Sequence, residues 1–251
     1  MSDLNAFESF MQDRLTNADD MMTEVGRIGP VIIRDIVEYS PITIEWPQWI
    51  KDKVIAEILS QLARAIAQYH KAVAFMRLGI KGMGDPDKLR AAGSTIHDKI
   101  YAASDSLAAG VRVGSLKAMD SDDWVGGSSR DYFNSFDGLR DEVRSVTRYS
   151  TILETALGDM AKAINDLFIT WRNAAIELGI AVAGLIVAIV GSPLVAPLVA
   201  GIVAFVGALI AMVVDLWTGI DSYNQSVSDV EGALQPPMGK WPRSTFSATG
   251  A

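Results

Sequence analysis

Few residues in this chain could carry out catalysis, and they lie far apart. The chain of 251 residues has two histidines, His70 and His97, and no cysteine. Neither histidine has an acidic or thiol partner at the spacing of a catalytic motif, so each is interpreted as a surface residue rather than part of a triad. The lack of cysteine excludes a disulfide scaffold and a thiolate metal site. The sequence therefore predicts neither an enzyme nor a cofactor.

Two short segments superficially resemble binding loops. Residues 79–84 contain three glycines, but they lack the strand-to-helix context and the Lys-Ser/Thr ending of a phosphate loop. Residues 120–123 are Asp-Ser-Asp-Asp, which begins like a calcium loop but lacks its sixth-position glycine and its terminal glutamate. We interpret the first segment as a turn between helices and the second as a solvated helix-capping turn. No metal site is predicted.

The most unusual segment is residues 178–214, which contains 37 residues without a charged side chain. A Gly-Ser-Pro sequence and a second proline break it in the middle, because proline lacks an amide donor and clashes with the preceding turn. The segment therefore predicts a hairpin of two arms, residues 178–190 and 198–214. At ~1.5 Å per residue the arms are ~20 Å and ~25 Å long, against ~30 Å of bilayer hydrocarbon. The candidate membrane-insertion residues are Leu178, Ile180, Leu185, Ile186, Val190, Pro193, Pro197, Val203, Phe205, Leu209 and Val214.

Three interpretations of this hairpin follow from its composition. It could be the core of a large helical bundle, because a helix that is apolar on every side is usually buried. It could be a permanent anchor of two spans. It could also be sheltered in water and enter a membrane or an oligomer in a second state. We favour the third interpretation, because a bundle of this size seldom needs so long an uncharged run.

The segments that surround the hairpin have the pattern of long amphipathic helices. Apolar residues follow one another at steps of four and three through residues 55–80, 132–171 and 216–234, and less strictly through residues 3–25 and 87–117. A period of 3.5 residues indicates left-handed packing at small crossing angles. The fold class predicted is all-α, an elongated bundle of long antiparallel heptad helices with an apolar helical hairpin.

The predicted organisation has three parts. Residues 1–118 form N-terminal helices, interrupted at residues 26–47 by a loop or short strand, because glycines, prolines and a β-branched run occur there. Residues 119–234 form a turn and a long helical hairpin with the apolar segment at its tip. Residues 235–251 form a flexible tail.

The charge of the chain limits its partners and its route of export. A formal net charge of -8 argues against nucleic acid and against a purely electrostatic attachment to anionic lipid. The first residues carry acids and lack an apolar core, so no Sec signal peptide is expected there. Membrane lipid is therefore the predicted partner, through the hairpin, with a second copy or another helical protein as a further possibility. The expected location is outside a bacterial cell by a non-Sec route, or at a membrane.

A short motif lies in the predicted turn between two long helices. Trp124 and Gly126 form a Trp-x-Gly sequence, and an aromatic-rich helix follows it. Here the chain resembles the Trp-x-Gly family of type VII (ESX) secretion substrates, over residues 87–163. The resemblance implies a helical hairpin with the motif in its turn. The family also uses a Tyr-x-x-x-Asp/Glu export signal, which Tyr101 and Asp105 match in spelling and, at four residues apart, on one helix face. The pair precedes the motif here, whereas the family places it after the second helix.

The layout is similar to two further groups. Longer ESX-associated secreted proteins follow a Trp-x-Gly hairpin with an apolar segment. Helical pore-forming toxins of the cytolysin A kind and colicin pore domains shield an apolar hairpin until they meet a membrane. The function expected is that of a type VII-exported helical protein that inserts its hairpin and forms a pore after oligomerisation. The alternative is a soluble helical bundle that binds a partner, or a secretion-associated partner, with the hairpin as its core.

Overall fold

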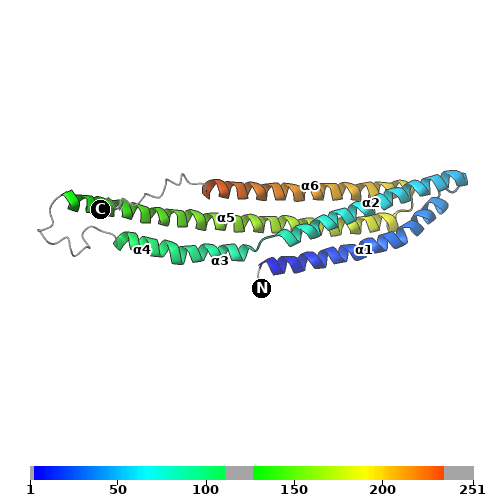
Figure 1. Cartoon of the computed structure of the whole chain (residues 1–251). Coiled ribbons are helices and arrows are strands. Elements are labelled where there is room, and N and C mark those ends of the chain that lie inside the picture. The colour runs from blue at the N-terminus through cyan, green and yellow to red at the C-terminus, as the bar shows by residue number, and fades with distance from the viewer. Residues whose placement is uncertain (1–2, 111–126, 235–251) are drawn as a thin grey trace, which may run out of the picture. The chain divides into compact units, whose positions relative to one another are not determined.

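Helices and the short turns between them make up the part of the chain that the structure describes (Figure 1). The structure is a computed structural model that describes residues 3–110 and 127–234, and it describes the side chains of residues 3–110 and 140–232. Within these ranges there is no strand, which confirms the predicted all-α fold. The elements are α1 (Asp3–Tyr39), α2 (Gln48–Gly82), α3 (Pro86–Ile96), a π-helical turn η1 (His97–Tyr101), α4 (Ala102–Gly110), α5 (Gly127–Gly191) and α6 (Val195–Leu234).

The helices group into two units. The described residues of Met1–Asp85 and Ile164–Tyr223 form unit 1, and those of Pro86–Ala163 and Asn224–Ala251 form unit 2. The grouping differs from the division between residues 118 and 119 that we expected from the sequence. The reason is that α5 and α6 are continuous helices, and each contributes one part of its length to each unit.

The prediction of a loop or strand over residues 26–47 is wrong for most of that segment. Helix α1 continues through Pro30 to Tyr39, and only residues 40–47 form the turn to α2. Val25, Gly29, Ile33 and Val37 are buried at steps of four. Tertiary packing of this face outweighs the weak local propensity for helix. Gly29 has a packing role, because a Cβ there would lie only 2.9 Å from Leu62 Cδ2 of α2.

The predicted amphipathic faces of α1 and α2 form the core of unit 1. The apolar positions of α1 from Phe7 to Val25 are buried, and most of the seam of α2 from Ile55 to Ile80 is buried with them. Phe7 of α1 stacks on Phe168 of α5, with ring centroids 4.2 Å apart. The two helical hairpins α1–α2 and α5–α6 thus share one apolar core in this unit, with α1 antiparallel to α2 (Figure 1).

A large buried aromatic residue ties α5 to α2 in unit 1. Trp171 is 1% exposed, and its ring stacks on Phe75 with centroids 5.8 Å apart. The indole lies directly against the backbone of Gly79, where a β-carbon would overlap it. Gly79 is therefore required by close packing, although it lies near the end of the helix.

A polar cluster joins α1 to α2 inside the same unit. Tyr69 is buried and donates its hydroxyl to Asp19 Oδ1 at 2.8 Å, and Arg77 donates to Asp19 Oδ2 at 2.5 Å. Burial, and then the hydrogen bond to Asp19, raise the pKa of Tyr69 well above its ordinary value. The neutral phenol is therefore the form that the folded protein favours.

This cluster predicts a loss of stability in alkali. A folded-state pKa that is raised contributes stability that is complete below the unfolded pKa of about 10 and is lost as the pH rises above it. Between pH 10 and pH 11 the free energy of unfolding of the wild type is expected to fall by up to about 1.4 kcal/mol more than that of Tyr69→Phe, because the variant lacks the phenol. At pH 7 the variant is expected to be about 1 kcal/mol less stable than the wild type.

Urea unfolding at pH 7, 9, 10 and 11 measures both effects. Tyr39→Phe is the matched control, because the Tyr39 ring is exposed. Parallel alkaline stability curves for the wild type and Tyr69→Phe would contradict this account.

In unit 2, α3, η1 and α4 pack against α5. His97 Nδ1 and Glu154 Oε2 are 2.9 Å apart, and the hydroxyls of Ser104 and Thr147 are 2.9 Å apart. Glu154 is thus an acidic partner of His97 from another helix, at a separation in sequence that no motif spacing covers, and the His97 side chain is about half exposed. The predicted turn residues Trp124 and Gly126 and the tail at residues 235–251 lie outside the described residues.

Candidate functional site

The predicted apolar hairpin is present, and its turn is shorter than expected. Helix α5 ends at Gly191 and α6 begins at Val195, so the turn consists of residues 192–194. Pro193 lies in this turn, and Pro197 lies in the first turn of α6, where its missing amide hydrogen would have no helical partner. The two arms meet closely near the turn, because Gly201 of α6 packs against Ala188 of α5 and leaves no room for a side chain.

One side of the hairpin is buried in unit 1. We call this set of residues the inner seam, and each member is at most 3% exposed. It contacts α1, since Ile189 Cδ1 would lie 3.7 Å from a Cβ on Gly29, and its member Leu209 lines a groove together with Ala72 and Phe75 of α2. The inner seam comprises Leu178, Val182, Leu185 and Ile189 of α5, with Leu198, Ile202, Phe205, Leu209 and Met212 of α6.

A second side of the hairpin is exposed, although it is as apolar as the first. We call this set the outer seam, and every member is more than half exposed, with Val187 reaching 68% and Val203 60%. On α6, Val203 and Ile210 of the outer seam each follow an inner-seam residue by one position, which is a rotation of about 100° around the helix. The outer seam comprises Ile180, Val187 and Val190 of α5, with Val203, Ile210, Val214 and Trp217 of α6.

The predicted insertion residues divide into a buried and an exposed set, and all but Ile186, Pro193 and Pro197 belong to one of the two seams. Leu178, Leu185, Phe205 and Leu209 are buried, and Ile186 is intermediate. The exposed members are Ile180, Val190, Pro193, Pro197, Val203 and Val214. Sequence reasoning did not find this division, because an arm that is apolar on all sides has no polar face from which its orientation could be deduced.

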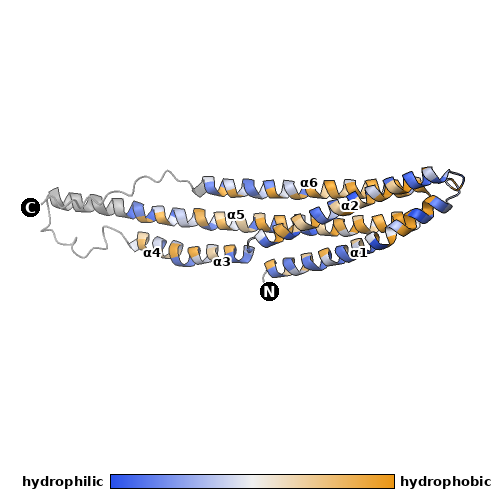
Figure 2. Cartoon of the chain, turned by 45° about the vertical axis from the view of Figure 1, so that its right-hand side comes forward, coloured by the Kyte–Doolittle hydropathy of each residue, from blue (hydrophilic) through white to orange (hydrophobic). Residues whose placement is uncertain are grey.

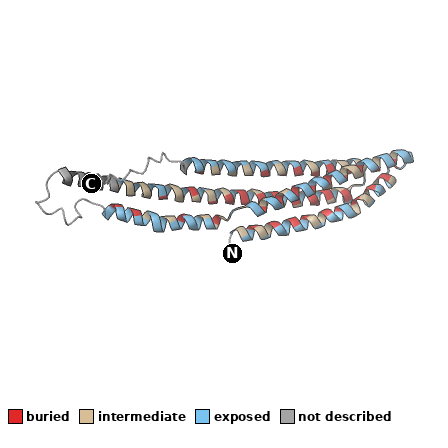
Figure 3. Cartoon of the chain, in the orientation of Figure 1, coloured by how far each residue is buried: buried red, intermediate tan, exposed pale blue. Residues whose placement is uncertain are grey.

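By length and composition, both helices that carry the hairpin could cross a membrane. Their most apolar 18-residue windows have mean hydropathies of 2.4 and 2.6, and only 33% and 28% of those windows is buried in the chain. Figure 2 shows the apolar residues of α5 and α6 concentrated toward the turn that joins them, and Figure 3 shows buried and exposed positions alternating along the same stretch. The hairpin is therefore not a fully buried core within the described residues.

A groove between α2 and α6 adds to this exposed apolar surface. Its volume is about 330 Å³, and it lies within unit 1. Trp217 of the outer seam stacks on Phe75 at its edge, with ring centroids 5.5 Å apart. The groove is lined by Gln68, Lys71, Ala72, Phe75, Leu209, Ile210, Val213, Val214 and Trp217.

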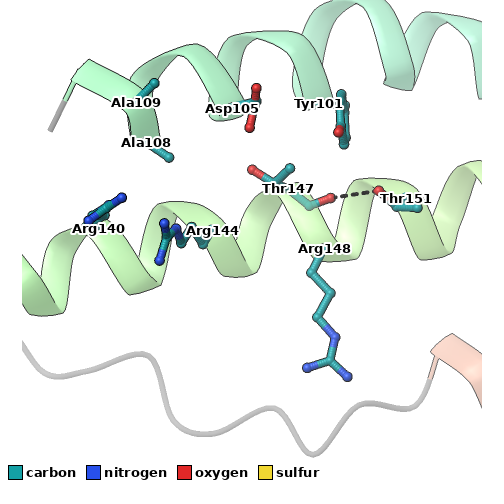
Figure 4. Close-up of a pocket in the computed structure, with 9 residues that line it drawn as sticks. All are labelled: Tyr101, Asp105, Ala108, Ala109, Arg140, Arg144, Thr147, Arg148 and Thr151. Carbon is teal, nitrogen blue, oxygen red and sulfur yellow. Dashed lines mark hydrogen bonds between the residues drawn. The ribbon is translucent and has the colours of Figure 1, made fainter.

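The proposed export pair lies in unit 2. Tyr101 and Asp105 line one groove of about 460 Å³ between α4 and α5, together with Arg140, Arg144 and Arg148. Figure 4 shows Asp105 and Tyr101 on the α4 side of this groove, with Arg148 pointing away from α4. The two residues therefore share one helix face, as the four-residue spacing predicts.

No group of three or more His, Cys, Asp or Glu residues that could hold a metal ion occurs in the described part of the chain. No protein-family model, no curated protein and no solved structure matches this chain.

Proposed function

We propose that this protein inserts the α5–α6 hairpin into a lipid bilayer. In water the inner seam is held against α1 and α2, and in the membrane the whole hairpin is surrounded by lipid. The observation that carries the proposal is the outer seam, whose apolar residues are more than half exposed along both arms. Exposed apolar surface of this extent marks a site of interaction with a membrane or a protein.

The energetics of the two states favour a switch rather than a permanent anchor. In water the inner seam gains by burial, at ~1.5–3 kcal/mol for each fully buried large side chain, while the outer seam gains nothing. In a bilayer both seams lie in an apolar solvent, so the transfer of the outer seam offsets the packing that the inner seam loses. Lipid therefore shifts the population toward the inserted state through its differential affinity for the hairpin. Assembly of several inserted hairpins would then form a pore.

Dye release from phosphatidylcholine vesicles tests the proposal. Purified protein is expected to release an entrapped dye at a rate that increases with protein concentration. Protein that releases no dye across pH and lipid composition, whether or not it binds the vesicles, would overturn it.

A second candidate function is assembly with a helical partner. Val203, Gly207, Ile210, Val214 and Trp217 follow steps of four and three on the exposed side of α6, which is the spacing of a coiled-coil seam. A partner helix or a second copy could cover this seam in water. Sedimentation velocity without lipid and co-sedimentation with vesicles together distinguish the two candidates. A stable oligomer that does not bind vesicles would favour assembly.

Export by a type VII system is a separate part of the proposal, and it rests on Trp124, Gly126, Tyr101 and Asp105. In a bacterium that carries such a system, Trp124→Ala with Gly126→Ala is expected to reduce secreted protein to background while the protein accumulates inside the cell. Immunoblots of medium and cells measure this. Asp229→Ala, which changes an exposed acid of α6, is the control. Unchanged secretion of the double variant would contradict the export route.

A further inference from the structure

The turn between α1 and α2 has an inverted arrangement of polar and apolar residues. Tyr39, Ile42, Ile44 and Trp49 are all more than half exposed, with Tyr39 at 71% and Trp49 at 68%. We call these four residues the apolar turn. Three polar residues between and beside them are buried, since Ser40 is 4% exposed, Thr43 1% and Lys51 8%, whereas Glu45 and Gln48 are exposed. Soluble proteins ordinarily place such residues the other way round.

Hydrogen bonds hold this arrangement in place. The amides of Thr43 and Ile44 both donate to Ser40 O, at 3.0 and 2.9 Å, and the Thr43 hydroxyl donates to the same oxygen at 3.3 Å. Lys51 Nζ donates to Ile44 O at 3.1 Å and to Glu38 O at 3.4 Å. The ammonium also lies where the dipole of α1 is negative. Because polar groups close the turn from inside, its apolar side chains are directed outward by the fold.

The position of the apolar turn relates it to the hairpin. Within unit 1 the α1–α2 turn lies at the same end as the α5–α6 turn, and it projects beyond that turn (Figure 1). Figure 3 shows exposed positions at this end of both helices, with buried positions among them. A surface that approaches this end of the unit meets the apolar turn before it meets the hairpin.

We infer that the apolar turn is a membrane-interface contact that docks unit 1 on lipid before the hairpin inserts. Tryptophan and tyrosine are the residues that concentrate at the boundary between headgroups and acyl chains, because each combines an apolar ring with a polar atom. The turn is a projection rather than a groove, so it fits a fluid interface better than a partner helix. Docking of the apolar turn does not depend on the proposed function, and only the later insertion of the hairpin rests on it.

The charges around the apolar turn determine which lipid it fits. Opposite charges nearly cancel there, with a small excess of acid, so attraction to anionic lipid is not the driving force. Burial of the apolar turn in the interface of a zwitterionic bilayer supplies the driving force for binding. The charged residues near the turn are Arg34, Asp35, Glu38, Glu45, Lys51, Asp52 and Lys53.

The test compares two double variants in the full chain. Ile42→Ser with Ile44→Ser removes half of the apolar turn, and Leu78→Ser with Ile169→Ser removes two exposed apolar residues elsewhere in unit 1. Co-sedimentation with phosphatidylcholine vesicles measures partitioning, and dye release measures insertion. We expect the turn variant to partition about tenfold more weakly than the wild type, and the control to partition as the wild type does. At lipid concentrations that bind all the protein, the turn variant is expected to release dye at the wild-type rate.

The remaining outcomes separate this inference from the proposed function. Wild-type protein that binds vesicles without releasing dye, with binding lost in the turn variant, would support docking and overturn hairpin insertion. Equal partitioning of the wild type and the turn variant would overturn docking, even if dye release is intact. A wild-type dimer that Ile42→Ser with Ile44→Ser dissociates, without any change in vesicle binding, would also overturn docking and assign the apolar turn to a protein interface. Unchanged circular dichroism shows that each variant is folded.

Discussion

Replacing Val187 and Val203 together with aspartate is expected to abolish dye release while leaving the folded protein intact. Both side chains belong to the outer seam and are mostly exposed, so the substitutions remove little packing in water. In the bilayer each aspartate costs about 2.5–3.5 kcal/mol on insertion scales. The pair therefore lowers the inserted population by at least about a thousandfold. Vesicle binding through the apolar turn is expected to remain.

Ile169→Asp is the matched control for this pair. Ile169 is an exposed apolar residue of the same helix, but it precedes the hairpin by nine residues. We expect it to retain dye release within about threefold of the wild-type rate. Urea unfolding in the absence of lipid shows whether any of the variants is destabilised. Full dye release by the Val187→Asp, Val203→Asp protein would contradict insertion of the hairpin by these arms.

The second large effect is expected at Gly79, where alanine should lower the free energy of unfolding by about 1–3 kcal/mol. Elsewhere in a helix, replacing glycine with alanine raises stability by about 0.5–1 kcal/mol. At Gly79 the new methyl group overlaps the indole of Trp171, which is fully buried and stacked on Phe75. The indole must therefore move, and the contact of α5 with α2 weakens. Urea denaturation measures the change.

Two comparisons separate this packing effect from helix propensity. Gly207→Ala in α6 adds a methyl group with no atom within 4 Å, so we expect its stability to be unchanged or higher. In a Trp171→Leu background, Gly79→Ala is expected to cost less than it does in the wild type, which gives a favourable coupling energy in a double-mutant cycle. If the losses of stability from Gly79→Ala and Trp171→Leu are additive, the methyl group at position 79 does not clash with the indole of Trp171. Because Gly79→Ala loosens the packed state, it is also expected to speed dye release.

The sequence predicted the fold where helices are amphipathic and failed where a pattern was absent or ambiguous. The faces of α1 up to Val25 and of α2 were predictable because polar residues mark the outside of each helix. Residues 26–39 were mistaken for loop or strand because glycine and proline there reflect close packing and tertiary support rather than an interruption. The pairing of His97 with Glu154 depends on contact between helices that no local spacing records.

Composition was enough to locate the candidate site in the sequence, but it did not predict which side of the hairpin is buried. An uncharged run identified the hairpin, but which residues face α1 and α2 depends on tertiary contacts such as that between Ile189 and Gly29. The apolar turn was also missed, because its β-branched residues indicated a strand. The signal that could have found it is the group of aromatic residues Tyr39, Trp46 and Trp49 beside a helical turn.

The cluster of Tyr69, Asp19 and Arg77 has a consequence for the alignment of α1 with α2. Two helices that meet through repeating apolar residues can slide past each other by one repeat, because each new pairing is again apolar against apolar. A slipped pairing would separate the phenol and the guanidinium from the carboxylate, and an unpaired polar group would remain in the core. The cluster therefore stabilises one register of α1 against α2 relative to the slipped ones. Even after the hairpin leaves, α1 and α2 would keep the apolar turn at their common end.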